Sequence, residues 1–413
     1  MAPPNQAIPE ALYRNALNLN RFRNSVSNEL INRYNDIILD ISYQLASIDD
    51  VTSPGTALRL RTILAQLQES LGSWAIDSSK VTINQLQGLV VLETDFIQEQ
   101  LKKLLPSNAA KRSVRTVEVS SNFAKSVVTT DPTEINVFTL PSELRATVTG
   151  VEPKFNLTAR DGAVITLPNG ATVQKTFRGL AKQQSDLFTK TVRNGLLIGE
   201  TTDQISRRLR GKLQFNQKGT VRQKIAAGGE ATRIANNQVH TIVRTSVNQV
   251  ANAASRSVYA ANKDITKQYK YVATLDSRTS SICARLDGQI FEYGKGPTPP
   301  QHFNCRSVIV AVIDNEFLNE FGISRDDLEI GTRPSKTGLK QIGQLVPANQ
   351  TYPEWLSKQP IDLQEEVFGK KRSALFRKQI RKGKSPTQVF RQFVREDGSE
   401  LTLKELEKFT KNS

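Results

Sequence analysis

Apolar side chains recur every three or four positions over much of the first hundred residues, a spacing that places them on one face of a helix. The clearest run comprises Phe22, Val26, Leu30, Tyr34, Ile37, Ile41 and Leu45. Loop-forming residues at 47–55 end this helix. Two more helical runs are expected at about 56–72 and 80–105. Residues 1–110 are therefore predicted to be helical, with a stripe that forms a core or meets a partner.

Composition narrows the class of protein. The chain has 413 residues, of which 38% are hydrophobic and 23% charged, which is typical of a globular protein with about two to four domains. No run approaches the ~18 consecutive apolar residues of a membrane helix, so no membrane segment is expected. The first residues lack a basic stretch followed by an apolar one, so no secretory signal is expected. Two cysteines exclude a disulfide-rich scaffold.

The pattern changes at residue 111. Residues 111–176 are rich in Val and Thr that often alternate, which predicts a β-rich insert, and Asn169-Gly170 predicts a hairpin turn between 163–166 and 171–173. Residues 177–270 read as a basic helical region, in which Thr201 and Gln204 have the form of a capping box and 231–259 form one long helix. The predicted fold class is α+β and predominantly α-helical.

Positive charge is concentrated in two blocks. The net charge is +16, and 175–270 contains 18 Lys and Arg against 5 Asp and Glu, whereas 370–384 contains 8 basic residues and no acidic one. Such blocks favour contact with phosphate, although basic helices can also be merely solvated. The candidate DNA-binding residues are Arg207, Arg208, Arg210, Lys212, Lys218, Arg222, Lys224, Lys370, Lys371, Arg372, Arg377, Lys378, Arg381 and Lys382.

Both cysteines and one of the two histidines lie in 271–334, a region expected to form a small sheet from the strands VATLD and SVIVAV. Cys283, His302 and Cys305 are ligand types that zinc prefers, and the fourth ligand of a structural zinc ion would be Asp276, Asp287 or a residue that the sequence does not reveal. The alternatives are two buried reduced thiols or a disulfide. His240, alone in a basic helix, is expected to be a surface or packing residue.

The remaining residues, 335–413, read as a linker at 336–350 followed by a basic helical C-terminal extension. Gly369 is expected to close one helix, and Thr402 with Glu405 forms a second capping box.

The sequence combines the motifs Thr274-x-Asp276-x-Arg278-Thr279, Cys283, Asp287-Gly288 and Pro299-Pro300-x-His302-x-Asn304-Cys305-Arg306. This combination resembles the bacteriophage Mu protein F-like minor head proteins, also called head morphogenesis proteins. Weaker support comes from Ile242-Val243-Arg244-Thr245 and from motifs near Trp355, Gly369 and Leu401. The resemblance covers about 180–413. Many relatives continue the motif as Cys-Arg-Cys, whereas this chain has Ser307.

The resemblance implies a non-enzymatic virion component that lies inside the capsid near the portal, is assembled in the host cytoplasm, and acts in head assembly and in packaging or ejection of DNA. Its implied partners are the portal protein, the major capsid or scaffolding protein, and double-stranded DNA bound without sequence preference. Two alternatives remain open: a metal-dependent nuclease or hydrolase, for which no convincing general base is present, and a cellular nucleic-acid-binding protein.

Overall fold

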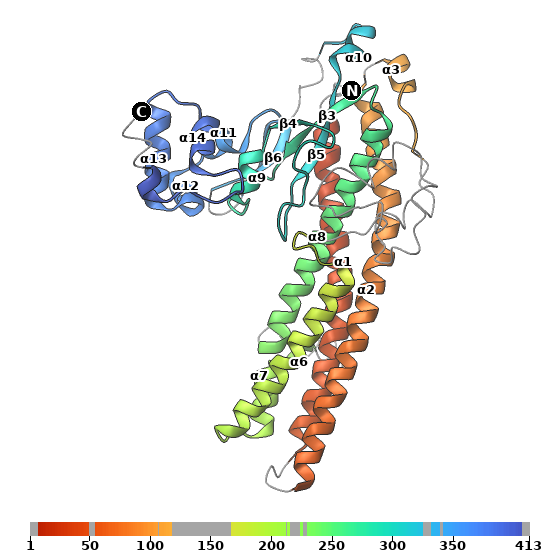
Figure 1. The fold of residues 1–413 in the computed structure, drawn as a ribbon, viewed down its shortest axis with the longest axis vertical. Helices are drawn as coiled ribbons and strands as arrows, with labels where there is room; N and C mark the ends of the chain where they lie inside the picture. Colours follow the sequence, from red (N-terminus) through yellow and green to blue (C-terminus); the bar gives the residue numbers. More distant parts are fainter. Residues whose placement is uncertain are drawn as a thin grey trace.

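A computed structural model describes residues 7–48, 54–105, 107–117, 167–211, 213–214, 224–225, 229–324, 332–338 and 342–406. The molecule has a long helical bundle with a small sheet on one side of its upper end, and a group of short helices projects beyond the sheet (Figure 1). The predicted class, α+β and predominantly helical, is confirmed. None of the described helices is long and apolar enough to cross a membrane.

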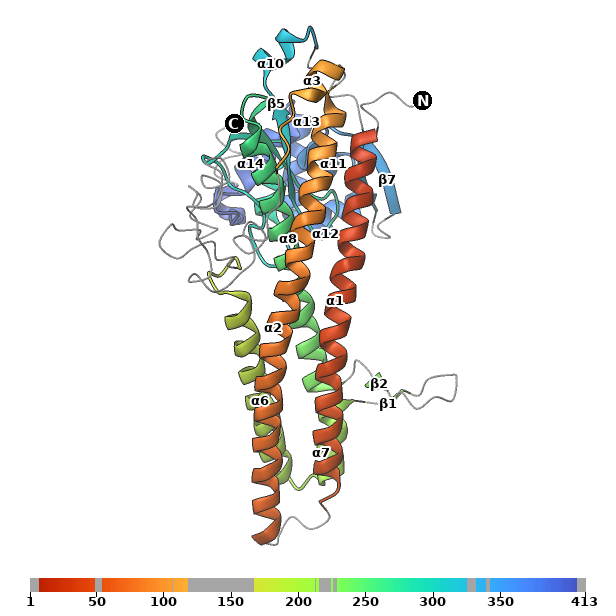
Figure 2. The ribbon, with the colours of Figure 1, turned by 90° about the vertical axis from the view of Figure 1, so that its right-hand side faces the viewer.

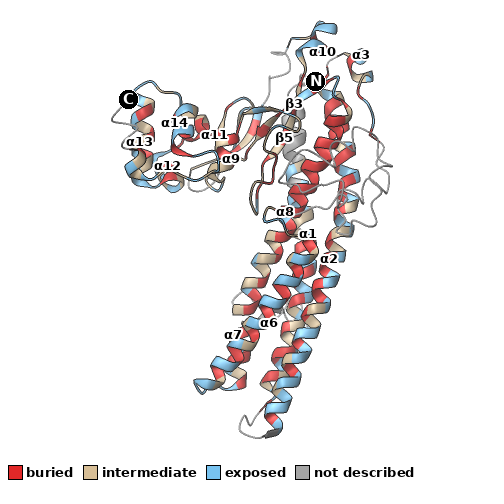
Figure 3. Ribbon diagram, viewed as in Figure 1, coloured by how far each residue is buried: buried red, intermediate tan, exposed pale blue. Residues whose placement is uncertain are grey.

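The bundle is built on α1 (Ala7–Ala46) and α2 (Pro54–Leu104), which run antiparallel along its length (Figure 2). The helices α6 (Val173–Leu197) and α7 (Thr202–Arg210) pack at the lower end, and α8 (Glu230–Ala261) runs from there to the sheet. Buried residues line the inner faces of these helices (Figure 3). The stripe on α1 is confirmed, since Val26, Leu30, Tyr34, Ile41 and Leu45 are buried.

An aromatic cluster joins three of the bundle helices. The Trp74 indole N–H donates to the Leu30 carbonyl oxygen at 3.0 Å, and its ring meets Tyr34 and Phe177 edge-on at 5.3 and 5.9 Å between centroids. The Tyr34 hydroxyl donates to the Gln184 side-chain oxygen at 2.9 Å. Because both polar tips are satisfied, these large rings can lie in the interior and hold α1, α2 and α6 together.

The expected break in the second helix is wrong, because α2 continues through residues 73–79. The Gly, Ser and Thr residues of this stretch are accommodated within the helix, and burial of its apolar side chains keeps it continuous. Gly72 has nothing within 4 Å of the position of a Cβ, so it serves no close approach. The Ser79 and Thr82 hydroxyls donate to carbonyl oxygens one turn earlier, at 2.7 and 2.8 Å, and Trp74 and Ala75 are buried. Burial of this face outweighs the weak local preference for a turn.

The predicted insert lies mostly outside the described residues, which resume at Leu167. The Asn169-Gly170 turn is present, with the Leu167 N–H donating to the Ala171 carbonyl oxygen at 2.8 Å and Gly170 at φ +77°. Val173 begins α6, capped by the Thr172 hydroxyl, so 173–176 are helical where strand was expected. On the other side of the insert lies α3 (Asn108–Arg112). The Thr201 capping box of α7 is confirmed.

A three-stranded antiparallel sheet follows the bundle, in the order β4-β3-β5. The strands are β3 (Thr266–Val272), β4 (Ile290–Glu292) and β5 (Val308–Ile313), and Tyr271 pairs with Ile309 across β3 and β5. The first strand begins within the region expected to be helical, since α8 ends at Ala261. Short helices α9 (Ser281–Leu286) and α10 (Asn315–Glu320) flank the sheet.

The segment 336–350, expected to be a linker, contains most of a β-hairpin formed by β6 (Thr332–Thr337) and β7 (Ile342–Pro347). The described parts of 212–225 include one more short antiparallel pair, β1 (Leu213–Gln214) with β2 (Lys224–Ile225). The hairpin is followed by the helices α11 (Tyr352–Ser357), α12 (Ile361–Phe368), α13 (Lys370–Arg381) and α14 (Pro386–Phe393). Gly369, at φ +75°, ends α12 as expected, and the Thr402–Glu405 capping box is present.

Two charged side chains, one of them buried, attach these helices to the sheet and to α9. The Asp287 carboxylate accepts hydrogen bonds from the Ala273 and Tyr352 backbone N–H groups, at 2.7 and 2.6 Å, and from Arg333 at 3.1 Å. The Arg285 guanidinium donates to the carbonyl oxygens of Arg391 and Val394, both at 2.7 Å. The C-terminal helices are thus fixed to the segment that carries Cys283.

Candidate metal centre and cationic surfaces

Cys283 is positioned by the first turn of α9. Ser280 caps this helix, with its hydroxyl accepting the Cys283 N–H at 3.4 Å. The Tyr271 hydroxyl, on β3, lies 3.2 Å from the Cys283 sulfur. A strand and a helix terminus therefore fix the direction of this thiol, which is buried at 2% exposure.

His302 and Cys305 are presented by one tight turn. The Cys305 N–H donates to the His302 carbonyl oxygen at 3.2 Å, and Asn304 adopts the left-handed conformation at φ +61°, which Asn tolerates better than most residues. This turn is docked on α8, where Thr245 Oγ1 accepts the Asn304 N–H at 3.0 Å and Thr241 lies 3.1 Å from the Asn304 amide nitrogen. The Arg-Thr pair of the sequence motif thus contributes a threonine that seats the turn.

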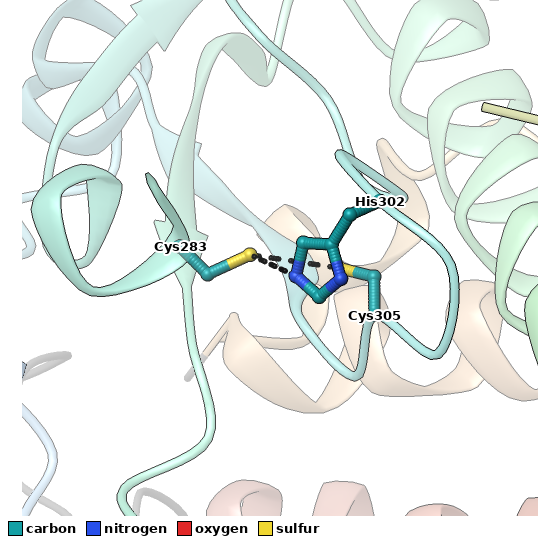
Figure 4. Close-up of side chains that lie close together, drawn as sticks. All are labelled: Cys283, His302 and Cys305. Carbon is teal, nitrogen blue, oxygen red and sulfur yellow. Dashed lines mark hydrogen bonds between the residues drawn. The ribbon is translucent and has the colours of Figure 1, made fainter. Parts of the chain in front are cut away.

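The three side chains converge (Figure 4). Their ligand atoms all lie within 4.8 Å of one another. The Cys283 sulfur is 3.4 Å from His302 Nε2 and 3.6 Å from the Cys305 sulfur. The cysteines are free thiols, so the disulfide alternative is not formed. In a tetrahedral zinc site, bond lengths of about 2.3 and 2.0 Å imply sulfur–sulfur and sulfur–nitrogen separations of about 3.8 and 3.5 Å. The two separations measured from the Cys283 sulfur fit that ion.

The hydrogen bonds around His302 favour the metal-binding tautomer. Its Nδ1 lies 2.8 Å from the Phe303 carbonyl oxygen, which can only accept, so we assign the proton to Nδ1. The lone pair of Nε2 then faces the thiols, and the Ser280 hydroxyl donates to it at 2.7 Å. A histidine held through its second nitrogen in this way is typical of zinc ligands.

The hydrogen bond between the two thiols favours a thiolate at Cys305 and a protonated thiol at Cys283. The hydrogen bond from Cys283 holds the pKa of Cys305 well below its usual value, with further support from His302 and the Ser307 backbone against the effect of burial. The same hydrogen bond raises the pKa of Cys283. The hydrogen bond to Cys305 raises the pKa of His302. A thiolate and an imidazole can hold a soft divalent cation, which displaces any proton from the imidazole when it binds.

The structure does not bring Asp276 or Asp287 to this cluster. Both oxygens of the Asp276 carboxylate are bound by the Arg306 guanidinium, one of them at 2.7 Å, and Thr279 donates to the same carboxylate at 3.2 Å. This arrangement explains the Asp-x-Arg-Thr motif as an anchor for the residue after Cys305. The Asp287 carboxylate accepts hydrogen bonds from Ala273 after β3, from Arg333 on β6 and from Tyr352 on α11, as described above. The three ligands therefore leave a fourth position unassigned.

Ser307 stands beside the cluster, although sequence reasoning considered it only as a missing cysteine. It is 2% exposed, and its hydroxyl is hydrogen-bonded to Cys283, where it lowers the pKa of that thiol. Tyr271 and Ser280 were also missed, because nothing in the local pattern marks a strand tyrosine or a helix cap as neighbours of a distant histidine.

The predicted DNA-binding residues of the first basic block have intramolecular partners or lie outside the described residues. Arg207 pairs with Asp203 at 2.6 Å and Arg208 with Glu200 at 2.9 Å, and the Arg210 guanidinium lies 5.9 Å from the centre of the Tyr43 ring. Lys212, Lys218 and Arg222 are not described, and Lys224 is described only as part of β2.

The second block forms one cationic face on α13. On a helix of 3.6 residues per turn, an arc of about 120° holds Lys370, Lys371, Lys378, Arg381 and Lys382, all of them exposed. Two members of the predicted set point elsewhere: Arg372 pairs with Glu400 at 2.9 Å, and Arg377 lies 3.9 Å from Glu365. We call the five exposed side chains the α13 cationic face.

Residues 186–310 match the family described as Phage Mu protein F like protein. The match runs from α6 into β5 and includes Cys283, His302 and Cys305. It confirms the resemblance over this part of the chain. An uncharacterized protein of Haemophilus influenzae is 45% identical over 53 residues, a stretch that covers 12% of this chain and 12% of that protein. No solved structure matches the chain.

Proposed function

We propose that this protein is a portal-associated minor head component of a phage particle, located inside the capsid, that contacts packaged DNA without sequence preference. The observation that carries the proposal is the family match over 186–310, which spans the Cys/His cluster and its supporting network. Portal protein and major capsid or scaffolding protein are the proposed partners, with assembly in the host cytoplasm and a role in packaging or ejection of DNA.

The proposal is tested on particles. Mass spectrometry of purified mature virions and of their precursors should detect this chain at a copy number far below that of the major capsid protein. A pull-down of the whole protein from infected cells should recover portal protein. Absence of the chain from both virions and precursors would refute the proposal and would favour a cellular nucleic-acid-binding protein.

We propose the α13 cationic face as the DNA contact. Its residues lie on a helix about 18 Å long, and the face carries five positive charges. Lys370 and Lys371 lie in the first turn of α13, where the helix macrodipole disfavours cations. Their positions therefore reduce the stability of the free protein unless an anion lies opposite. A polyphosphate surface such as the DNA backbone matches it in charge and extent.

Salt dependence tests this contact. Replacement of Lys370, Lys371 and Lys378 by Gln should weaken binding of random duplex DNA and reduce the slope of log affinity against log salt by about 2.7, at about 0.9 for each lost phosphate contact. A variant with Lys80, Lys190 and Lys263 changed to Gln removes the same charge from exposed sites elsewhere. Equal slopes for the two variants would refute the assignment.

We also propose that Cys283, His302 and Cys305 hold one structural zinc ion. Bound zinc would supply a cross-link between α9 and the 302–305 turn. Protein purified without chelator should contain close to one zinc per chain, and a chelator should lower its melting temperature. His302→Gln should abolish metal binding, whereas His240→Gln, which changes the other histidine of the chain on α8, should not. Metal-free protein with an unchanged melting profile would refute the site.

A further inference from the structure

Three arginines from distant parts of the chain approach one another where the bundle meets the sheet. Arg23 lies on α1, Arg244 on α8, and Arg306 directly after Cys305. Arg23 is half-buried, Arg244 is exposed, and the Arg306 side chain is 30% exposed. Burial and the charges of Arg244 and Arg306 together lower the pKa of Arg23 to about 10, as expected when like charges share a poorly solvated region.

Helix register and loop anchoring bring these groups together independently. The Tyr34 hydroxyl lies 3.5 Å from the Ala231 carbonyl oxygen, which fixes α1 against α8. Because the two helices run in opposite directions, Arg23 and Arg244 lie at similar distances from that contact, about 17 and 20 Å at 1.5 Å per residue. The 302–305 turn is docked on Thr245, the residue after Arg244, through the Asn304 N–H, and Arg306 directly follows this turn.

The positive charge there is only partly offset. Asp276 binds Arg306 through both guanidinium Nη atoms. Arg23 donates its Nε–H to the Leu19 carbonyl oxygen at 3.0 Å, and within the described ranges neither Arg23 nor Arg244 has a carboxylate partner. One half-buried guanidinium, that of Arg23, and one exposed guanidinium, that of Arg244, thus remain without a counter-charge from the described residues. Such an arrangement is unfavourable in the free protein and favourable when an anion binds.

We propose that Arg23, Arg244 and Arg306 form an oxyanion site that binds a phosphate group. The planar fork of a guanidinium donates two parallel hydrogen bonds to phosphate oxygens. Both Nη atoms of Arg306 bind Asp276, so Arg306 is held in place and offers only its remaining N–H groups to the anion. The site is separate from the α13 cationic face and does not depend on the proposed portal role. The phosphate comes either from a DNA phosphodiester or from free inorganic phosphate.

The test uses the full chain and inorganic phosphate as the probe. Phosphate titrated at constant ionic strength should raise the melting temperature and give a saturable calorimetric signal. Arg23→Gln and Arg244→Gln should each weaken this binding about tenfold or more, the usual effect of losing one charged hydrogen bond. Arg21→Gln, at an exposed position on the same helix, is the matched control and should bind like the wild type.

Equal phosphate affinity in the wild type and both site variants would overturn the proposal, as would a phosphate response of the wild type no larger than its response to chloride. Arg244→Gln keeps the test valid if Arg23→Gln fails to fold, because Arg244 is exposed. A short random duplex identifies the source. Competition between duplex and phosphate supports a phosphodiester ligand, whereas phosphate binding that duplex does not displace supports free phosphate.

Discussion

Glu93 makes the stability of the bundle depend on pH. It is 4% exposed on α2, and its carboxylate accepts hydrogen bonds from the Asn15 amide at 3.1 and 3.0 Å. Burial raises the pKa of Glu93 from 4.5 to about 7 despite those hydrogen bonds. The folded protein therefore retains a proton that the unfolded chain releases above pH 4.5. Stability contributed by the neutral carboxyl is fully present below that pH and is lost as the pH rises through about 7.

The size of the effect follows from the gap between the two pKa values. At about 1.4 kcal/mol per unit, a gap of about 2.5 lowers the free energy of unfolding by about 3 kcal/mol above pH 8. Glu93→Gln mimics the neutral form, so the variant should match the wild type near pH 4.5 and exceed it by about 3 kcal/mol at pH 8 in urea unfolding. Glu99→Gln, exposed on the same helix, is the control. A difference between Glu93→Gln and wild type that stays constant over this pH range would refute the reasoning.

Three further predictions concern the candidate site. Ser307→Cys adds a thiol beside Cys283 and should raise zinc affinity about tenfold or more, measured by competition with a chromophoric chelator; unchanged affinity would mean that residue 307 does not reach the ion. Asp276→Asn leaves Arg306 without its charge partner and should lower the free energy of unfolding by about 2–4 kcal/mol, while elemental analysis still finds zinc; loss of the metal alone would make Asp276 a ligand. Gly398→Ala places a Cβ 2.5 Å from that of Ile282 at φ +83° and should lower the free energy of unfolding by at least about 1–2 kcal/mol; an unchanged melting temperature would contradict this close contact.

The regular helices were predictable from the sequence because their cores are periodic. The stripe on α1 and the capping box at Thr201 depend on residues three or four apart, so a local pattern contains the whole signal. The continuity of α2 was not predictable in this way, since it depends on Trp74 packing against Tyr34 and Phe177, which are far away in the sequence. The β6–β7 hairpin was missed for a related reason: its sequence, with Gly and Pro at both ends, resembles a linker.

The residues of the candidate site likewise differ in whether a local sequence pattern could predict them. Cys283, His302 and Cys305 were recognisable because zinc ligands are few in kind and the spacing of the last two suits a tight turn. The sequence could not show that Asp276 and Asp287 are unavailable as a fourth ligand. Only the fold brings them to their partners, Arg306 and Arg333. The same holds for Arg372 and Arg377, which belong to a basic run in the sequence but turn inward to Glu400 and Glu365.

The position of α8 explains how a small cluster can influence the whole molecule. This helix is buried almost all round from Thr245 to Ala260, because one side faces the bundle and another faces the sheet. Its Asn252 accepts the Ile309 N–H at 3.2 Å and lies 3.3 Å from the Ser307 carbonyl oxygen, so the strand that follows Cys305 is bonded directly to the bundle. On the other side of the cluster, α9 carries Cys283 and holds the C-terminal helices through Arg285. A link between Cys283 and the 302–305 turn would therefore add to the Asp276–Arg306 ion pair in joining the bundle to the part of the molecule that carries the α13 cationic face.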